Sequence, residues 1–105
     1  MSDVIVRYKV KEGRGDENQA LVEAVFAELA AGNPAGLRYG TFRLDDGVTF
    51  IHIARIEGAE NPLTSTEAFA AFTADLPDRC DEPPQTHGCN RRAKLPVTRR
   101  VIADG

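Results

Sequence analysis

The chain has 105 residues, of which 42% are hydrophobic and 28% charged, the size and balance of one globular domain. No apolar run approaches the roughly 20 residues of a membrane span, and the N-terminus lacks the segments of a signal peptide, so we expect a cytoplasmic protein that contacts no membrane. Residues 1–84 carry a net charge of −7, which argues against nucleic acid as a partner, because phosphate neutralisation drives that binding.

The first two elements predicted in chain order are a strand and a helix. Apolar and polar residues alternate over residues 4–11, which is the period of a half-buried strand. Asp16, followed three residues later by Gln19, resembles a capping box at a helix start. The residues that share the apolar face of this helix are Val22, Val25, Phe26 and Leu29. A Gly-Asn-Pro sequence at residues 32–34 predicts the end of the helix.

A hairpin is predicted next. Residues 36–44 and 48–56 have the composition of strands, and the Asp-Gly pair between them favours the positive φ angles of a tight turn. One face of the later strand carries Phe50, His52, Ala54 and Ile56. Its other face carries Ile51 and Ile53. A strand that is apolar on both faces is typical of the centre of a sheet covered on both sides.

The second helix is predicted to begin at Thr64, with Glu67 at the N3 position of a capping box. Its inward face is predicted to hold Phe69, Phe72, Thr73 and Leu76. Pro77 is expected to end this helix or to bend it into a last irregular turn.

The C-terminal segment, residues 85–105, has a net charge of +4. Pro83-Pro84 predicts an extended start, and we expect a weak fourth strand somewhere between Gln85 and Ile102. Residues 85–90 are poor strand formers without apolar alternation. We therefore expect residues 1–84 to be the well-defined part of a single domain. The basic segment should be its least ordered part, docking, if at all, through its charges.

The predicted order of elements is β-α-β-β-α-β, which indicates a ferredoxin-like α+β domain. Right-handed crossovers give an antiparallel four-stranded sheet of order 4-1-3-2 with both helices on one face. The other face carries Ile5 and the second apolar face of the third strand. A second copy of the chain is the simplest cover for that face, so we expect a homodimer.

Two segments are similar to a known family. The sequence VRYKVKEGR at residues 6–14 resembles the opening strand of the dimeric α+β barrel proteins related to the antibiotic biosynthesis monooxygenases. The sequence GLRY at residues 36–39, followed by the hairpin into Phe50, resembles their second strand. The likeness covers about residues 3–84 and fades in the last 21.

The resemblance implies a homodimer in which two sheets close a barrel, with a small pocket between the sheet and the helices of each subunit. The best-understood members oxidise aromatic polyketides or degrade haem without a conventional cofactor, using Asn and Trp with Arg or His. This chain has no Trp, and its predicted first strand has no Asn. We expect a small-molecule-binding protein with no cofactor; as an enzyme it would be a cofactor-independent monooxygenase-like oxidoreductase. The alternative is a non-catalytic structural or protein-interaction dimer.

The candidate pocket residues are His52, Tyr39, Tyr8, Phe50, Phe72 and Arg7. A neutral His52 could act as a base or orient a ligand, although it could also be a hydrogen-bonded core or interface histidine. The tyrosines could point hydroxyls into the pocket or pack with them at the sheet rim. Arg7 and Lys9 share a face, which suggests a polar barrel interior, an anion site or ion pairs with neighbouring acids.

Two further site classes are rejected. Cys80, His87 and Cys89 do not have the spacing of a zinc site, so we predict no metal and free thiols. The third strand partly matches the signature of RNA-recognition domains at Gly47 and Phe50. It lacks the basic start and two aromatics of that signature, which argues against RNA binding.

Overall fold

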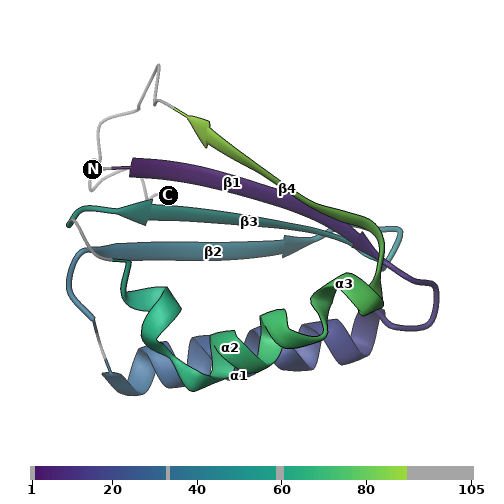
Figure 1. Cartoon of the computed structure of the whole chain (residues 1–105), viewed down its shortest axis with the longest axis horizontal. Helices are drawn as coiled ribbons and strands as arrows, with labels where there is room; N and C mark the ends of the chain where they lie inside the picture. Colours follow the sequence, from purple (N-terminus) through teal and green to yellow (C-terminus); the bar gives the residue numbers. More distant parts are fainter. Residues whose placement is uncertain (1, 33, 59–60, 90–105) are drawn as a thin grey trace, which may run out of the picture.

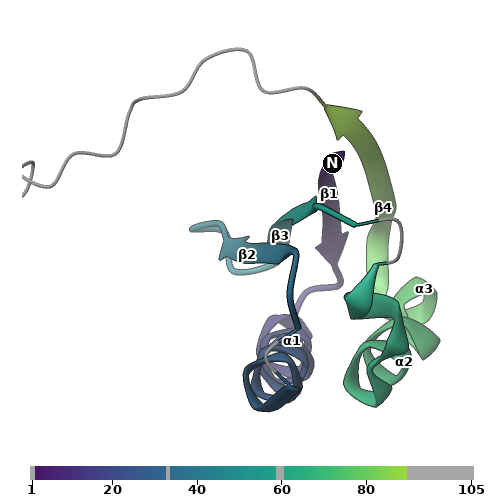
Figure 2. The ribbon, with the colours of Figure 1, turned by 90° about the vertical axis from the view of Figure 1, so that its left-hand side faces the viewer.

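A four-stranded antiparallel sheet with helices on one side forms the framework of the computed structural model, which describes residues 2–32, 34–58 and 61–89 (Figures 1 and 2). The elements are β1 (Ser2–Val10), α1 (Gly15–Gly32), β2 (Leu37–Arg43), β3 (Thr49–Ile56), η1 (Pro62–Ser65), α2 (Glu67–Ala74), α3 (Leu76–Arg79) and β4 (Cys80–Cys89). The strand order β2-β3-β1-β4 confirms the predicted ferredoxin-like topology, with β3 between β1 and β2.

The registers of β1, β2 and β3 bring the predicted pocket residues to one face of the sheet. Val6 of β1 and Thr41 of β2 both pair with His52 of β3, while Tyr8 pairs with Phe50. Partners in a register point to the same side, and successive residues alternate. The inner face, which the helices cover, therefore carries Tyr8, Phe50 and His52.

The main core lies between this inner face and the helices. Tyr8, Val10 and Phe50 from the sheet are at most 1% exposed. The buried helical residues that pack with them are Val22, Val25, Leu29, Phe72 and Leu76. Both predicted helical stripes thus face the core, but Leu76 lies in the separate short helix α3 and not in α2. Phe26 is half-buried and stacks on Tyr39 with ring centroids 4.8 Å apart.

The start of α1 differs from the prediction. The helix begins at Gly15, and the side chains of Asp16 and Gln19 accept hydrogen bonds from the Arg43 guanidinium instead of capping the helix. A Cβ at Gly15 would collide with the Gly47 carbonyl and with Arg43. The close approach of the β2–β3 turn to the helix therefore explains why the helix begins at Gly15 and why Asp16 and Gln19 do not cap it.

The start of α2 corrects the prediction that Thr64 is its N-cap. The N-cap is Thr66, whose hydroxyl oxygen accepts from the Phe69 N–H, while Thr64 lies in the one-turn helix η1. Glu67 is consequently the first residue of α2. The carboxylate of Glu28 in α1 accepts from the Glu67 and Ala68 N–H groups and so satisfies two free donors of α2 from outside the helix.

The fourth strand begins earlier than predicted. β4 starts at Cys80 and pairs with β1 as far as Cys89, with register shifts beside Pro83-Pro84. The expectation that residues 85–89 are poor strand formers is wrong, since their backbone pairs with β1; that the basic segment is the least ordered part stays a prediction. Proline is tolerated here because β4 is an edge strand. The rest of the basic segment, residues 90–105, lies outside the described residues, and so does its predicted docking through charge.

The outer face of the sheet is not covered by any described element (Figure 2). Phe42 is 56% exposed there and Ile53 is 41% exposed. Arg55 and Asp3 form a half-buried ion pair on the same face, with an N–O distance of 2.7 Å. None of the described helices is long and apolar enough to cross a bilayer.

Candidate functional site

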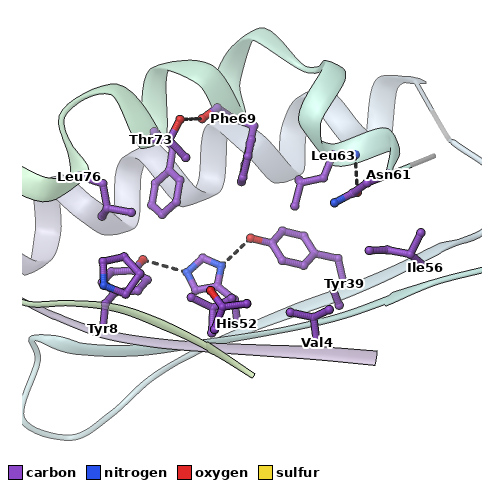
Figure 3. Close-up of a pocket in the computed structure, with 15 residues that line it drawn as sticks. Val4, Tyr8, Tyr39, His52, Ile56, Asn61, Leu63, Phe69, Thr73 and Leu76 are labelled. Atoms are coloured by element: carbon purple, nitrogen blue, oxygen red, sulfur yellow. Dashed lines mark hydrogen bonds between the residues drawn. The ribbon is translucent and has the colours of Figure 1, made fainter. Parts of the chain in front are cut away.

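A cavity of about 330 Å³ lies between the inner face of the sheet and the C-terminal helices, with η1 at one end and β4 along one side (Figure 3). Its apolar lining consists of Val4, Val6, Ala54, Ile56, Leu63, Phe69, Phe72, Leu76 and Pro84. The volume lies in the range of sites for small organic molecules. The walls favour an apolar, ring-sized occupant.

Three polar side chains from three different strands meet in this cavity. The Tyr8 hydroxyl lies 2.8 Å from His52 Nε2, and the Tyr39 hydroxyl lies 2.5 Å from His52 Nδ1 (Figure 3). Thr41 Oγ1 is a more distant neighbour of Nδ1, at 3.3 Å. Both ring nitrogens of His52 therefore have hydrogen-bond partners. The imidazole is held between two tyrosines in a largely apolar pocket.

Two buried polar residues behind the cavity continue this chain of contacts. Asn18 of α1 donates from Nδ2 to the Tyr8 hydroxyl at 2.8 Å. Arg79 of α3 donates from Nε to Asn18 Oδ1 at 2.9 Å, and from Nη2 to the Phe72 carbonyl at 2.9 Å. The Arg79–Asn18–Tyr8–His52–Tyr39 series is hereafter called the relay. Its five residues come from α3, α1, β1, β3 and β2, so it joins the helices to three strands of the sheet.

Burial keeps the titratable members of the relay that line the cavity uncharged. Burial lowers the pKa of His52 to about 4. Burial likewise raises the pKa of Tyr39 to about 12, an effect that a hydrogen bond from Thr41 partly offsets. Burial also raises the pKa of Tyr8, and the hydrogen bond from Asn18 partly offsets this rise. At neutral pH the cavity therefore contains a neutral imidazole and two neutral phenols.

Arg79 is the charged member of the relay, and its side chain is fully buried. Its guanidinium lies over the Phe72 ring, 5.4 Å from the centroid. The nearest carboxylate is Asp75, 4.0 Å from Nη1, and Asp75 is itself half exposed and paired with Arg14. The Nη1 atom has no hydrogen-bond partner within the described part of the chain. The buried positive charge of Arg79 is thus only weakly balanced by a carboxylate, and it lies at the end of the relay that is away from the cavity, hereafter called the closed end.

The structure brings four of the six sequence-predicted pocket residues together: His52, Tyr8, Tyr39 and Phe72 all line the cavity. Phe50 does not, since it lies beneath Tyr8 with ring centroids 5.6 Å apart. Arg7 is placed elsewhere, because strand alternation puts it on the outer face. There it is exposed and 3.6 Å from Glu82, which corrects its assignment to the pocket and matches the ion-pair alternative.

Asn18 and Arg79 were missed by sequence reasoning, although the sequence contains a signal for both. Asn18 stands four residues before Val22, on the same helical stripe as Val25 and Leu29. Arg79 stands three residues after Leu76, in line with the stripe of the second helix. A polar residue at core spacing is expected to be buried with hydrogen-bond partners.

Cys80 and Cys89 are free thiols, the first half-buried and the second exposed. Burial raises the pKa of the Cys80 thiol, which leaves it protonated and unreactive at neutral pH. No three His, Cys, Asp or Glu side chains of the described residues are grouped so that they could hold a metal ion.

No protein-family model matches the sequence, and no curated protein matches it. Solved structures do match. Rv0793 from Mycobacterium tuberculosis aligns over 90% of this chain and 98% of its own, with a TM-score of 0.72 and 16% identity. A candidate antibiotic biosynthesis monooxygenase from Nitrosomonas europaea aligns over 89% and 100%, with a TM-score of 0.75 and 14% identity.

A third similar structure is SnoaB, a cofactor-independent oxygenase from Streptomyces nogalater. It aligns over 91% of this chain and 97% of its own, with a TM-score of 0.68 and 17% identity. At these identities the likeness establishes the fold. The resemblance to proteins related to the antibiotic biosynthesis monooxygenases is thereby confirmed at the level of architecture.

Proposed function

We propose that the protein binds a small, largely apolar molecule of one to three rings in the cavity beside His52. The observation that carries this proposal is a cavity of about 330 Å³ with apolar walls and the Tyr8–His52–Tyr39 trio inside it. Protein interiors are normally packed without voids of this size. A few convergent polar groups in an apolar pocket are typical of a ligand site.

The alternative of a ligand-free structural dimer predicts a sheet–helix interface filled by Phe50, Phe69 and Phe72. Phe69 and Phe72 instead stand at the wall of an open cavity, and Phe50 packs under Tyr8. This arrangement supports the binding proposal over the structural one.

Isothermal titration with 1-indanone and with indane tests the binding proposal. Ala54 is buried and lines the cavity, so Ala54→Leu should fill the space and abolish binding. Ala24→Leu makes the same change at an exposed position of α1 and should leave binding intact. Equal binding by wild type and Ala54→Leu would refute the assignment of the cavity as the site.

We also propose that two copies pair through their outer sheet faces. The exposed side chains of Phe42 and Ile53 support this, because a monomer rarely leaves such neighbouring apolar groups in water. Light scattering should show a dimer, and Ile53→Lys should dissociate it, while Ala30→Lys on α1 should not. A monomeric wild type at micromolar concentration would end this part of the proposal.

A second candidate activity is cofactor-independent oxidation of a ring ketone by O₂. Two observations favour it: the structural likeness to SnoaB, and a hydrogen-bonding trio placed against an apolar cavity. Anthrone is a suitable probe, since anthrone and one O₂ give anthraquinone and one water. Oxygen uptake that is lost in Tyr39→Phe would support this activity, and uptake equal to that of buffer would exclude it for this substrate.

A further inference from the structure

We propose that Asn18, oriented by Arg79, fixes the direction of the hydrogen bonds in the relay, so that the cavity presents a proton donor from Tyr39 and selects ligands with an acceptor oxygen. A carbonyl or phenolate oxygen is the acceptor class that fits. The inference rests on the proposed function for its ligand. Asn18 and Arg79 reach the ligand only through other residues and are therefore positioning residues.

The direction is set at the closed end of the relay. A guanidinium has only donors, so the Asn18 atom 2.9 Å from Arg79 Nε must be the amide oxygen. The amide nitrogen of Asn18 then faces Tyr8 and donates to its hydroxyl at 2.8 Å. Since an amide nitrogen cannot accept, the hydroxyl proton of Tyr8 must go elsewhere.

The next step concerns His52. Tyr8 is 1% exposed, and His52 Nε2, at 2.8 Å, is the other polar atom within hydrogen-bond reach among the described contacts. If Nε2 carried the imidazole proton, the Tyr8 proton would be buried without an acceptor, which costs free energy. The Tyr8 hydroxyl therefore donates to Nε2, and the neutral imidazole carries its proton on Nδ1.

The last step is a count of protons. His52 Nδ1–H donates to the Tyr39 oxygen, so Tyr8, His52 and Tyr39 supply three protons for two links, and the Tyr39 proton is left over. Tyr39 lines the cavity and is only half-buried, so this proton can reach a ligand. The Thr41 hydroxyl donates to the Tyr39 oxygen, so it adds one proton and one link and leaves this surplus of one proton unchanged. The cavity thus offers a ligand a donor.

Replacing the amide nitrogen of Asn18 by an oxygen should reverse the direction of the hydrogen bonds in the relay. In Asn18→Asp the carboxylate keeps its contact with Arg79 and accepts the Tyr8 proton. His52 Nε2–H then donates to Tyr8, Tyr39 donates to Nδ1, and all three protons are used. The cavity would present only the lone pairs of Tyr39. The substitution changes no shape and places a carboxylate beside a buried cation, so the fold should survive it.

Nitrogen-15 NMR of the imidazoles tests the direction without any ligand. We expect His52 of the wild type to show protonated Nδ1 and unprotonated Nε2, and Asn18→Asp to show the opposite tautomer. The other histidine, His87, is exposed and serves as an internal reference. Protonated Nε2 in the wild type, or an unchanged tautomer in Asn18→Asp, would overturn the inference. The wild-type result decides even if the variant fails to fold.

Two matched variants control for charge and for proximity. Asn61 also lines the cavity and its side-chain oxygen caps η1, a role that aspartate can fill. Asn61→Asp should leave the His52 tautomer unchanged, as should Thr41→Val. A reversed tautomer in either variant would mean that the direction does not come from Asn18.

Ligand preference is the second readout. Wild type should bind 1-indanone, which has an acceptor, roughly five- to tenfold more tightly than indane, the size of one net hydrogen bond. Asn18→Asp should lose this preference and favour indole, which has only a donor, over indane. Tighter wild-type binding of indole than of 1-indanone would overturn the inference. If no probe binds any variant, the proposed function fails and the tautomer result alone decides the inference.

Discussion

The two faces of one sheet are built in opposite ways. On the inner face, polar groups are buried, neutral and hydrogen-bonded in series, with His52 only 6% exposed. On the outer face, apolar groups are exposed, with Phe42 at 56%. The buried polar groups of the inner face are held in one specific geometry, and a core that only stabilises the fold does not need such groups. This difference is what the proposed ligand site on the inner face and the proposed contact between two copies on the outer face would require.

The largest expected contrast between the faces is in core packing. Phe50→Ala on the inner face should lower the free energy of unfolding by about 3–5 kcal/mol, because it leaves a cavity under Tyr8. Phe42→Ala on the outer face should cost less than about 0.5 kcal/mol when it is made in the Ile53→Lys background, which prevents the proposed pairing of two copies, because Phe42 is already exposed. Urea titration of both variants measures this, and equal losses would show that the faces do not differ as described.

The second contrast is in pH dependence. The pKa of His52 is about 4 in the folded protein and about 6.5 when unfolded, so the unfolded chain takes up a proton first as pH falls. The free energy of unfolding should therefore decrease between pH 6.5 and 4, by about 3 kcal/mol, and this contribution should level off below pH 4.

His52→Gln keeps a donor and an acceptor without titrating, and it should remove most of this pH dependence. His87→Gln, on the exposed part of β4, should retain it. Urea titrations at half-unit steps of pH compare the three proteins. A wild-type curve that is flat over this range would contradict the burial of a neutral His52.

The smallest expected effect is at Arg7. The Arg7–Glu82 pair on the outer face is about half exposed, with an N–O distance of 3.6 Å, and such pairs contribute about 0–1 kcal/mol. Arg7→Ala should leave the thermal midpoint nearly unchanged and should not alter the affinity for 1-indanone. A loss of affinity for 1-indanone would show that Arg7 contributes to ligand binding, which would contradict its assignment to the outer face.

The topology was predictable because β1, α1 and α2 carry regular apolar periods and because β3, apolar on both faces, has the pattern of a central strand. β4 was placed too late in the sequence because its side chains after Cys80 are exposed and show no period; backbone pairing with β1 holds it. Thr66 was missed as a cap because η1 precedes the helix. His52, Tyr8 and Tyr39 were identified from their strands, but their convergence depends on the register between strands, which the sequence does not reveal.

Methyl-resolved NMR during titration with 1-indanone tests the central claim, ligand binding at the inner face, most directly. Apolar methyl groups divide between the faces: Val4, Val6, Leu63 and Leu76 line the cavity, whereas strand alternation places Ile5, Ile51 and Ile53 on the outer face. We predict saturable shifts of the cavity methyls and none of the outer ones. Shifts confined to the outer isoleucines, or no shifts at all, would contradict the claim.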